Sequence, residues 1–96
     1  MDLDNTTPEE IIQLADDGDS EAQFYLGMMY EMGMGVEKGF ESAYVWYRKS
    51  ADQGHAKSQY NVGVCLAIGK GIDKDVEEAK KWIKEANKNG YSGGIF

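Results

Sequence analysis

The chain has 96 residues, enough for one domain with one modest core. Hydrophobic residues make up 42% and charged residues 28%, which is typical of a globular domain, and no apolar run approaches the roughly 20 residues that cross a bilayer. The formal net charge of −7 argues against binding to nucleic-acid backbones, so neither a membrane nor a nucleic acid is an expected partner.

Residues 8–17 are predicted to form the first helix. Thr7 is a suitable N-cap, Pro8 suits the first helical position, and Glu10 completes a capping box. These three residues together predict a helix start more specifically than composition alone.

Residues 20–32 and 40–53 are predicted to form a helical hairpin. Apolar residues recur in both segments at helical spacing, and Trp46 lies on the inward stripe of the second segment. Gly33 and Gly35 separate the two helices, and glycine is the residue that most easily takes the positive φ of such a corner.

Residues 56–68 and 76–89 are predicted to repeat this hairpin 36 positions later. When residues 15–54 are aligned with residues 51–90, 12 of 40 positions are identical, whereas average residue usage gives about two or three by chance. The identical pairs include Gly27 with Gly63, Gly33 with Gly69, Ala43 with Ala79, and Trp46 with Trp82. Self-similarity at this period is typical of a solenoid.

Half a unit precedes the two hairpins and a short tail follows them. Ile11 aligns with Tyr47 and Ile83, so residues 8–17 correspond to the second helix of a hairpin and are predicted to cap the stack. Phe96 is in register with Phe24, and we predict that it folds back into the place of the next repeat. The predicted parts of this single domain, residues 1–96, are a capping helix at 8–17, repeats at 18–53 and 54–89, and a tail at 90–96.

Residues at corresponding places in the two units form a family pattern. In the first unit they are Ala22, Leu26-Gly27, Tyr30, Gly33-Met34-Gly35-Val36, Ala43, Trp46 and Gly54. In the second they are Val62-Gly63, Gly69-Lys70-Gly71-Ile72, Asp75, Ala79, Trp82, Ala86 and Gly90, with departures at Gly39, Ser58 and Leu66. The pattern resembles the Sel-one-like repeat, a relative of the tetratricopeptide repeat. The resemblance implies an all-α fold, a short right-handed α-solenoid of antiparallel helix hairpins whose concave face binds proteins.

No residue group predicts catalysis or metal binding. His55 has no second histidine nearby in the sequence, and Cys65 takes the place of Met29 on a buried stripe, so both are predicted to be structural. Residues 16–19 do not have the spacing of a calcium loop, and the Gly-x-Gly pairs follow helices, as turns do. We therefore predict that the chain is not an enzyme and has no cofactor or metal, and that Trp46 and Trp82 belong to the core.

The contrast between the two units predicts a binding patch. Three apolar or aromatic residues of the first unit have polar counterparts in the second, and equivalent positions should have equivalent surroundings. The pairs are Tyr25 with Asn61, Met34 with Lys70, and Tyr44 with Lys80. We expect the first unit to expose these side chains as a patch with an acidic rim. The rim residues are Glu21, Glu31 and Glu37. The alternative is that the three side chains pack on the N-terminal helix.

The charge is divided unevenly along the chain. Residues 1–41 contain eleven acidic residues and one lysine, a formal charge of −10, whereas residues 42–96 contain six acidic and nine basic residues, a charge of +3. The acidic half is expected to attract a partner protein with a basic surface. The predicted function is a protein–protein interaction module, an adaptor or scaffold. The alternatives are an immunity-type inhibitor of a basic toxin such as a nuclease, and a self-assembling protein, so a monomer or a weak salt-sensitive homo-oligomer is expected.

The first residues lack the basic and apolar segments of a secretory signal, so a cytoplasmic location is predicted. A mature secreted or periplasmic fragment is the alternative. The single cysteine, Cys65, cannot form an internal disulfide, which favours a reducing compartment.

Overall fold

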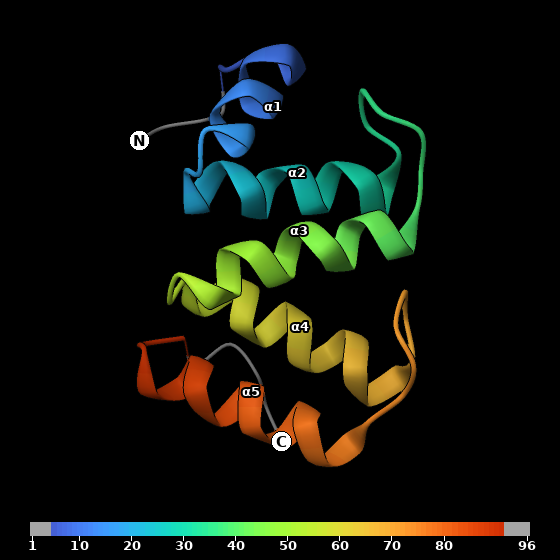
Figure 1. The fold of residues 1–96 in the computed structure, drawn as a ribbon, viewed down its shortest axis with the longest axis vertical. Helices are drawn as coiled ribbons and strands as arrows, with labels where there is room; N and C mark the ends of the chain where they lie inside the picture. Colours follow the sequence, from blue (N-terminus) through green and yellow to red (C-terminus); the bar gives the residue numbers. More distant parts are fainter. Residues whose placement is uncertain (1–4, 92–96) are drawn as a thin grey trace.

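The computed structural model describes residues 5–91, and these form five α-helices. The helices are α1 (Pro8–Asp16), α2 (Ser20–Met32), α3 (Phe40–Asp52), α4 (Ala56–Ile68) and α5 (Val76–Lys88). Each helix packs on the next one in the chain, so the helices stack in sequence order along the long axis of the molecule (Figure 1). The structure confirms the predicted all-α stack of hairpins, and every helix end lies within one residue of its predicted place. None of these helices is long and apolar enough to cross a bilayer.

The helix starts follow the capping chemistry of the sequence. Thr7 Oγ1 accepts a hydrogen bond from the Glu10 N–H at 3.2 Å, and Asp75 Oδ1 accepts one from the Glu78 N–H at 3.0 Å. Such a cap satisfies a backbone N–H that has no partner within the helix. In contrast, α3 begins after Gly39, which has no side chain that could cap the helix.

Glycines close the corners between the paired helices. Gly33 ends α2 in the left-handed region with φ 70°, and Gly69 ends α4 in the same way with φ 74°. At the first corner the Met34 N–H donates to the Met29 carbonyl at 2.9 Å. This six-residue hydrogen bond is typical of a helix end at a left-handed glycine.

Two further glycines let the helices of each hairpin approach closely. A Cβ built on Gly27 would lie 2.5 Å from the ring of Tyr47, and a Cβ built on Gly63 would lie 2.6 Å from Ile83. Because the same helix positions are used in both units, the hairpins have the same internal packing. Tyr47 fills the space in the first hairpin and is only 1% exposed.

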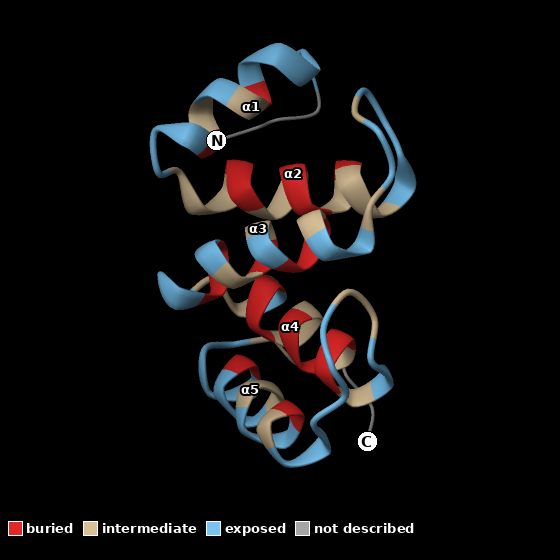
Figure 2. Cartoon of the chain, turned by 45° about the vertical axis from the view of Figure 1, so that its right-hand side comes forward, coloured by how far each residue is buried: buried red, intermediate tan, exposed pale blue. Residues whose placement is uncertain are grey.

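The core consists of two clusters along the stack. One cluster lies between α1 and α2, and the other joins α3, α4 and α5. The buried members of the first are Ile11, Ala15, Ala22, Leu26 and Met29. The buried members of the second are Ala43, Tyr44, Tyr47, Ala51, Val62, Cys65, Leu66 and Ala79. Figure 2 shows buried residues where neighbouring helices face each other, and largely exposed surfaces on α1 and α5 at the two ends.

The two tryptophans are not fully buried, so the prediction that they belong to the core needs correction. Trp46 and Trp82 are half-buried and pack against the edges of the two clusters. Lys49 Nζ lies 5.5 Å from the Trp46 ring centre, and Arg48 Cζ lies 5.0 Å from that of Trp82. A cation over an indole face needs an accessible ring, which explains the partial exposure. The predicted fold-back of Phe96 lies outside the described residues.

Candidate protein-docking site

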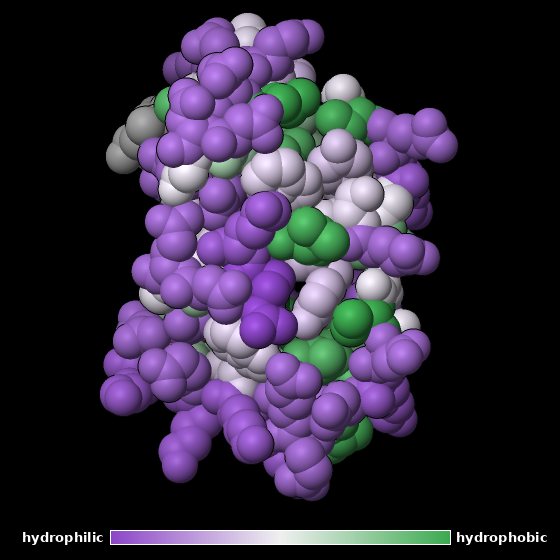
Figure 3. All heavy atoms as spheres, in the orientation of Figure 1, coloured by the Kyte–Doolittle hydropathy of each residue, from purple (hydrophilic) through white to green (hydrophobic). Residues whose placement is uncertain are grey.

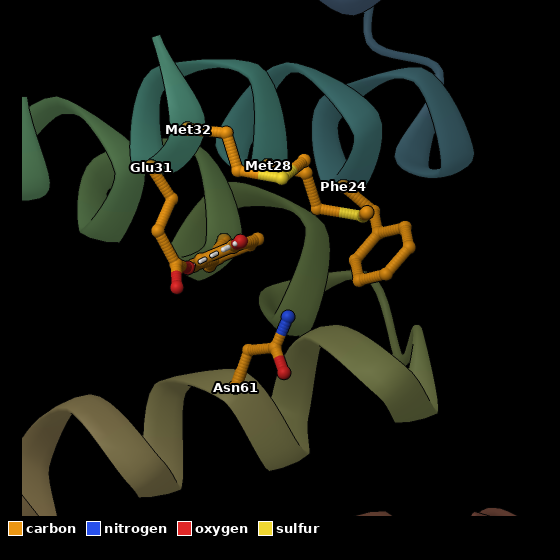
Figure 4. A pocket seen from close by; sticks show the side chains of 6 residues that line it. Phe24, Met28, Glu31, Met32 and Asn61 are labelled. Atoms are coloured by element: carbon orange, nitrogen blue, oxygen red, sulfur yellow. Dashed lines mark hydrogen bonds between the residues drawn. The ribbon is translucent and has the colours of Figure 1, made fainter. Parts of the chain in front are cut away.

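A hollow of about 310 Å³ lies between α2 and α4. Phe24, Met28 and Met32 line it from α2, and Asn61 lines it from α4. Figure 4 shows these side chains extending into one space from the two helices. The ring of Tyr47, from α3, also lines this α2–α4 hollow.

A second hollow of about 390 Å³ lies on the other side of α2, against α1. It shares Met28 and Met32 with the first hollow, so the two are adjacent. Its other side-chain lining consists of Thr6, Pro8, Ile11, Tyr25, Met29 and Met34. We call this the α1–α2 hollow. Both volumes are within the range of ordinary ligand pockets, which start at about 300 Å³.

Methionines separate and line the two hollows. Met32 and Met34 are 54% and 55% exposed, and Met28 is half-buried between them and the core. A methionine side chain is unbranched and polarisable, and it adapts to irregular apolar surfaces. Exposed methionines around a concave surface are therefore suited to docking a partner's apolar side chains.

Two polar side chains that line the α2–α4 hollow, Glu31 and Tyr47, form hydrogen bonds within the chain. Tyr47 donates from its hydroxyl to Glu31 Oε1 at 2.8 Å, and Lys70 Nζ donates to Glu31 Oε2 at 2.8 Å. Burial alone would raise the pKa of Glu31, but these two hydrogen bonds and the lysine charge lower it. Burial, and then the bond to Glu31, raise the pKa of Tyr47. Glu31 is thus a carboxylate that joins the two repeats, and its charge is largely compensated.

The structure brings some of the predicted patch together and separates the rest. Tyr25 and Met34 both line the α1–α2 hollow, with Tyr25 half-buried and Met34 exposed. Glu37 is exposed in the loop after α2, and Glu21 is half-buried in the first turn of α2. Glu31 instead belongs to the α2–α4 hollow and pairs with Lys70.

The expectation that Tyr44 is exposed is wrong. Its side chain is only 8% exposed and belongs to the cluster that joins α3 and α4. The counterpart Lys80 is exposed because α5 is the last helix of the described stack, whereas α4 covers the same face of α3. Equivalent positions in a stack have equivalent surroundings only when both have a following neighbour.

The sequence comparison missed Phe24, Met28 and Met32. Their counterparts Tyr60, Val64 and Ile68 are also apolar, so a search for differences between the units does not find them. The available signal was their spacing of four residues, a second apolar stripe beside the core stripe of α2. When a helix has apolar residues on two faces, its hairpin partner can bury only one of them, so the other needs a second neighbour.

The candidate catalytic residues are arranged as structural groups. His55 Nδ1 accepts from the Ser58 N–H at 3.3 Å and so caps α4. Ser58, whose hydroxyl lies 2.9 Å from His55 Nδ1, is fully buried and donates to Ser50 Oγ at 2.7 Å. Cys65 is buried, and burial raises the pKa of its thiol. Over residues 5–91, no group of three or more metal-binding side chains is present.

The stacked hairpins, their glycine corners and their close glycine–aromatic contact define an α-solenoid of the tetratricopeptide-like class. The Sel1 repeat family matches residues 20–55 and again residues 56–91, together three quarters of the chain. The chain therefore belongs to the Sel1 repeat family, whose domains are typically protein-interaction modules. Comparison with curated protein sequences found no match.

Solved structures of Sel1 repeat proteins are similar to this chain. A Sel1 repeat protein from Oxalobacter formigenes is 33% identical with a TM-score of 0.85, and the match covers 88% of this chain and 63% of that protein. The protective antigen c5321 of uropathogenic Escherichia coli, which displays an SLR fold, is 32% identical with a TM-score of 0.83, over 86% of this chain and 18% of that protein.

The cysteine rich protein B of Helicobacter pylori has the same fold, with a TM-score of 0.84 at 23% identity, over 88% of this chain and 63% of that protein. The chain thus spans less than two thirds of each of these three proteins.

Proposed function

We propose that this Sel1 repeat domain is a docking module that binds an apolar segment of a partner protein across α2. The observation that supports this proposal is the pair of adjacent hollows of about 310 and 390 Å³ that share Met28 and Met32. In the view of Figure 3 the surface is mainly hydrophilic and its hydrophobic groups form separate patches. The apolar lining of the two hollows differs from this mainly hydrophilic surface, and a large apolar side chain of a partner could bury itself there.

The charge of the surrounding helices favours a basic partner. Exposed acidic side chains lie on and just after α1, in the loop between α2 and α3, and at the start of α3; they are Glu9, Glu10, Asp16, Asp17, Glu37 and Glu41. Their field attracts lysine and arginine residues and increases the rate of encounter. The proposed ligand is thus a segment with one or two large apolar residues flanked by basic residues.

The test uses two synthetic peptides with the same apolar anchors, one flanked by lysines and the other by glutamates. We expect the lysine peptide to bind the intact chain more tightly, with the difference decreasing as salt is added. The double variant Met32→Gln/Met34→Gln should weaken binding about tenfold or more, because it removes two exposed apolar contacts. Isothermal titration calorimetry measures both effects.

The matched control is Ile68→Gln. Ile68 is the counterpart of Met32 in the second repeat, is 62% exposed and lines neither hollow. Equal loss of binding in this control and in the methionine variant would contradict the proposed site. Tighter binding of the glutamate peptide would contradict the proposed partner chemistry.

An inhibitor of a basic toxin is the second candidate, and the acidic charge of residues 1–41 supports it equally. A toxin-like reading frame beside the gene would favour this version over a general adaptor. Salt-sensitive oligomers at micromolar concentration would favour self-assembly instead. A non-catalytic role is part of the proposal, because the Ser58 hydroxyl and the Cys65 thiol are both buried.

A further inference from the structure

A third hollow with an apolar lining lies at the opposite end of the stack, between α4 and α5, and we call it the C-terminal slot. It encloses about 380 Å³. Its apolar lining consists of Ala67, Val76, Ala79 and Ile83, and its polar lining of Lys80, Lys84 and Asn87. Among the described residues α5 packs closely on α4 alone, so no further helix of residues 5–91 covers this slot.

The C-terminal slot corresponds by register to a surface that is covered in the first repeat. The residues 36 positions earlier are Glu31, Phe40, Ala43, Tyr44, Tyr47, Arg48 and Ala51. The second repeat covers that surface: Lys70 bonds to Glu31 at 2.8 Å, and a Cβ on Gly71 would overlap the Phe40 carbonyl group. The slot is thus the face on which a following helix packs.

The junction that starts a following helix is also repeated at the C-terminal end. Three contacts made at the junction between α3 and α4 recur 36 positions later at the end of α5. The first is a backbone hydrogen bond, His55 N–H to Ser50 O at 3.4 Å, which recurs as Tyr91 N–H to Ala86 O at 3.0 Å. The second is a ring contact, Phe24 with His55 at 5.0 Å between centroids, which recurs as Tyr60 with Tyr91 at 5.1 Å. The third is a side-chain amide hydrogen bond, Gln53 to Gln23 at 2.9 Å, which recurs as Asn89 to Gln59 at 3.0 Å. The end of α5 therefore has the geometry of a repeat junction.

Two substitutions distinguish the slot from the covered surface. The buried Tyr44 is replaced by Lys80, and Arg48, which bonds to Tyr44 and Asp52, is replaced by Lys84. Both lysines are exposed, and among residues 5–91 no carboxylate lines the slot, although Lys80 Nζ lies 3.5 Å from Glu77 Oε1 in an exposed pair beside it. An occupant that buries the apolar walls would favour acidic residues beside these two lysines, since the pair of Lys80 with Glu77 is exposed and weak.

We propose that the C-terminal slot binds one amphipathic helix of a partner protein, with an apolar face flanked by glutamate or aspartate, in the place that α4 occupies on the first repeat. The length expected is that of α4, 13 residues. The acidic helix α1 of a second copy is not the occupant, because its apolar residues Ile11 and Ala15 are buried against α2. This inference is independent of the function proposed for α2.

The test is a titration of the full ¹⁵N-labelled chain with a synthetic helical peptide of about 18 residues, with leucine and alanine on one face and flanking glutamates. We expect amide shifts at Ala79 and Ile83 and weaker binding in high salt. The variant Lys80→Glu/Lys84→Glu should weaken binding about tenfold, the loss of two partly buried ion pairs. The matched control Lys81→Glu/Lys88→Glu makes the same charge change on α5 outside the slot and should change binding less than about twofold.

Three results would overturn this proposal. The first is equal loss of affinity in the two lysine variants, which would mean that only net charge matters. The second is a set of amide shifts confined to α1 and α2. The third is binding by a chain shortened after Tyr91 but not by the full chain, which would mean that residues 92–96 compete for the slot. Because the amide shifts are read on α5, a negative result here does not contradict the docking site proposed at the two hollows beside α2.

Discussion

Gly27→Ala should destabilise the fold through one defined collision. The added Cβ would lie 2.5 and 2.6 Å from two ring carbons of Tyr47, a ring that is only 1% exposed and whose hydroxyl is held by Glu31 Oε1 at 2.8 Å. Overpacking of this kind costs about 1–3 kcal/mol, and the better helix propensity of alanine offsets about 1 kcal/mol. Because a shift of the ring would also break its hydroxyl bond to Glu31, the cost is at the upper end, and we expect a net loss of about 1–2 kcal/mol. In a domain of this size that lowers the Tm by about 5–15 °C.

Urea unfolding of a double-mutant cycle tests this prediction. Tyr47→Val removes both ring carbons from the collision, so in that background Gly27→Ala should be neutral or should stabilise by about 0.5–1 kcal/mol. The change of sign is the diagnostic result, because a general intolerance of side chains at position 27 would give the same loss in both backgrounds. Equal losses would refute the packing explanation.

Three more predictions follow from individual contacts. Burial lowers the pKa of His55 in the folded chain below its ordinary value of 6.5. Near and below pH 6.5 the unfolded chain therefore binds more protons than the folded chain, and the free energy of unfolding should fall as the pH drops below about 6.5. His55→Asp, which restores the residue found one repeat earlier, should remove that decline in a series of melting curves. Lys70→Gln should cost about 0.5–1 kcal/mol in low salt and less in high salt, because the half-exposed pair with Glu31 is screened. Cys65, which is 3% exposed, should react with a maleimide only as fast as the chain opens, and a rate equal to that of a free thiol would contradict its burial.

The repeat pattern was sufficient to predict the fold of this chain. The 36-residue period, the capping residues before α1 and α5, and the corner glycines placed all five helices within one residue of their observed ends. These are local features, because caps and left-handed glycines act within a few residues of the backbone. The predicted acidic N-terminal half likewise depends on composition alone.

The site was predicted only in part. Tyr25 and Met34 do line one hollow, but Phe24, Met28 and Met32 were not distinguished from core residues. An apolar residue at helical spacing has the same sequence signature whether it faces a neighbouring helix or a groove. Glu31 was expected at an open rim, and its pairing with Lys70 joins residues 39 positions apart.

The sequence by itself determined the hairpin, its period and its charge, since each depends on residues close together in the chain. Only the tertiary structure decided which faces of the hairpins are covered. Tyr44 and Lys80 occupy the same place in their hairpins, yet one is buried by α4 and the other lies beside a slot that no other helix of residues 5–91 covers. The physical reason is that burial depends on whether a neighbouring helix is present, and the pattern that the two repeats share does not say where one is.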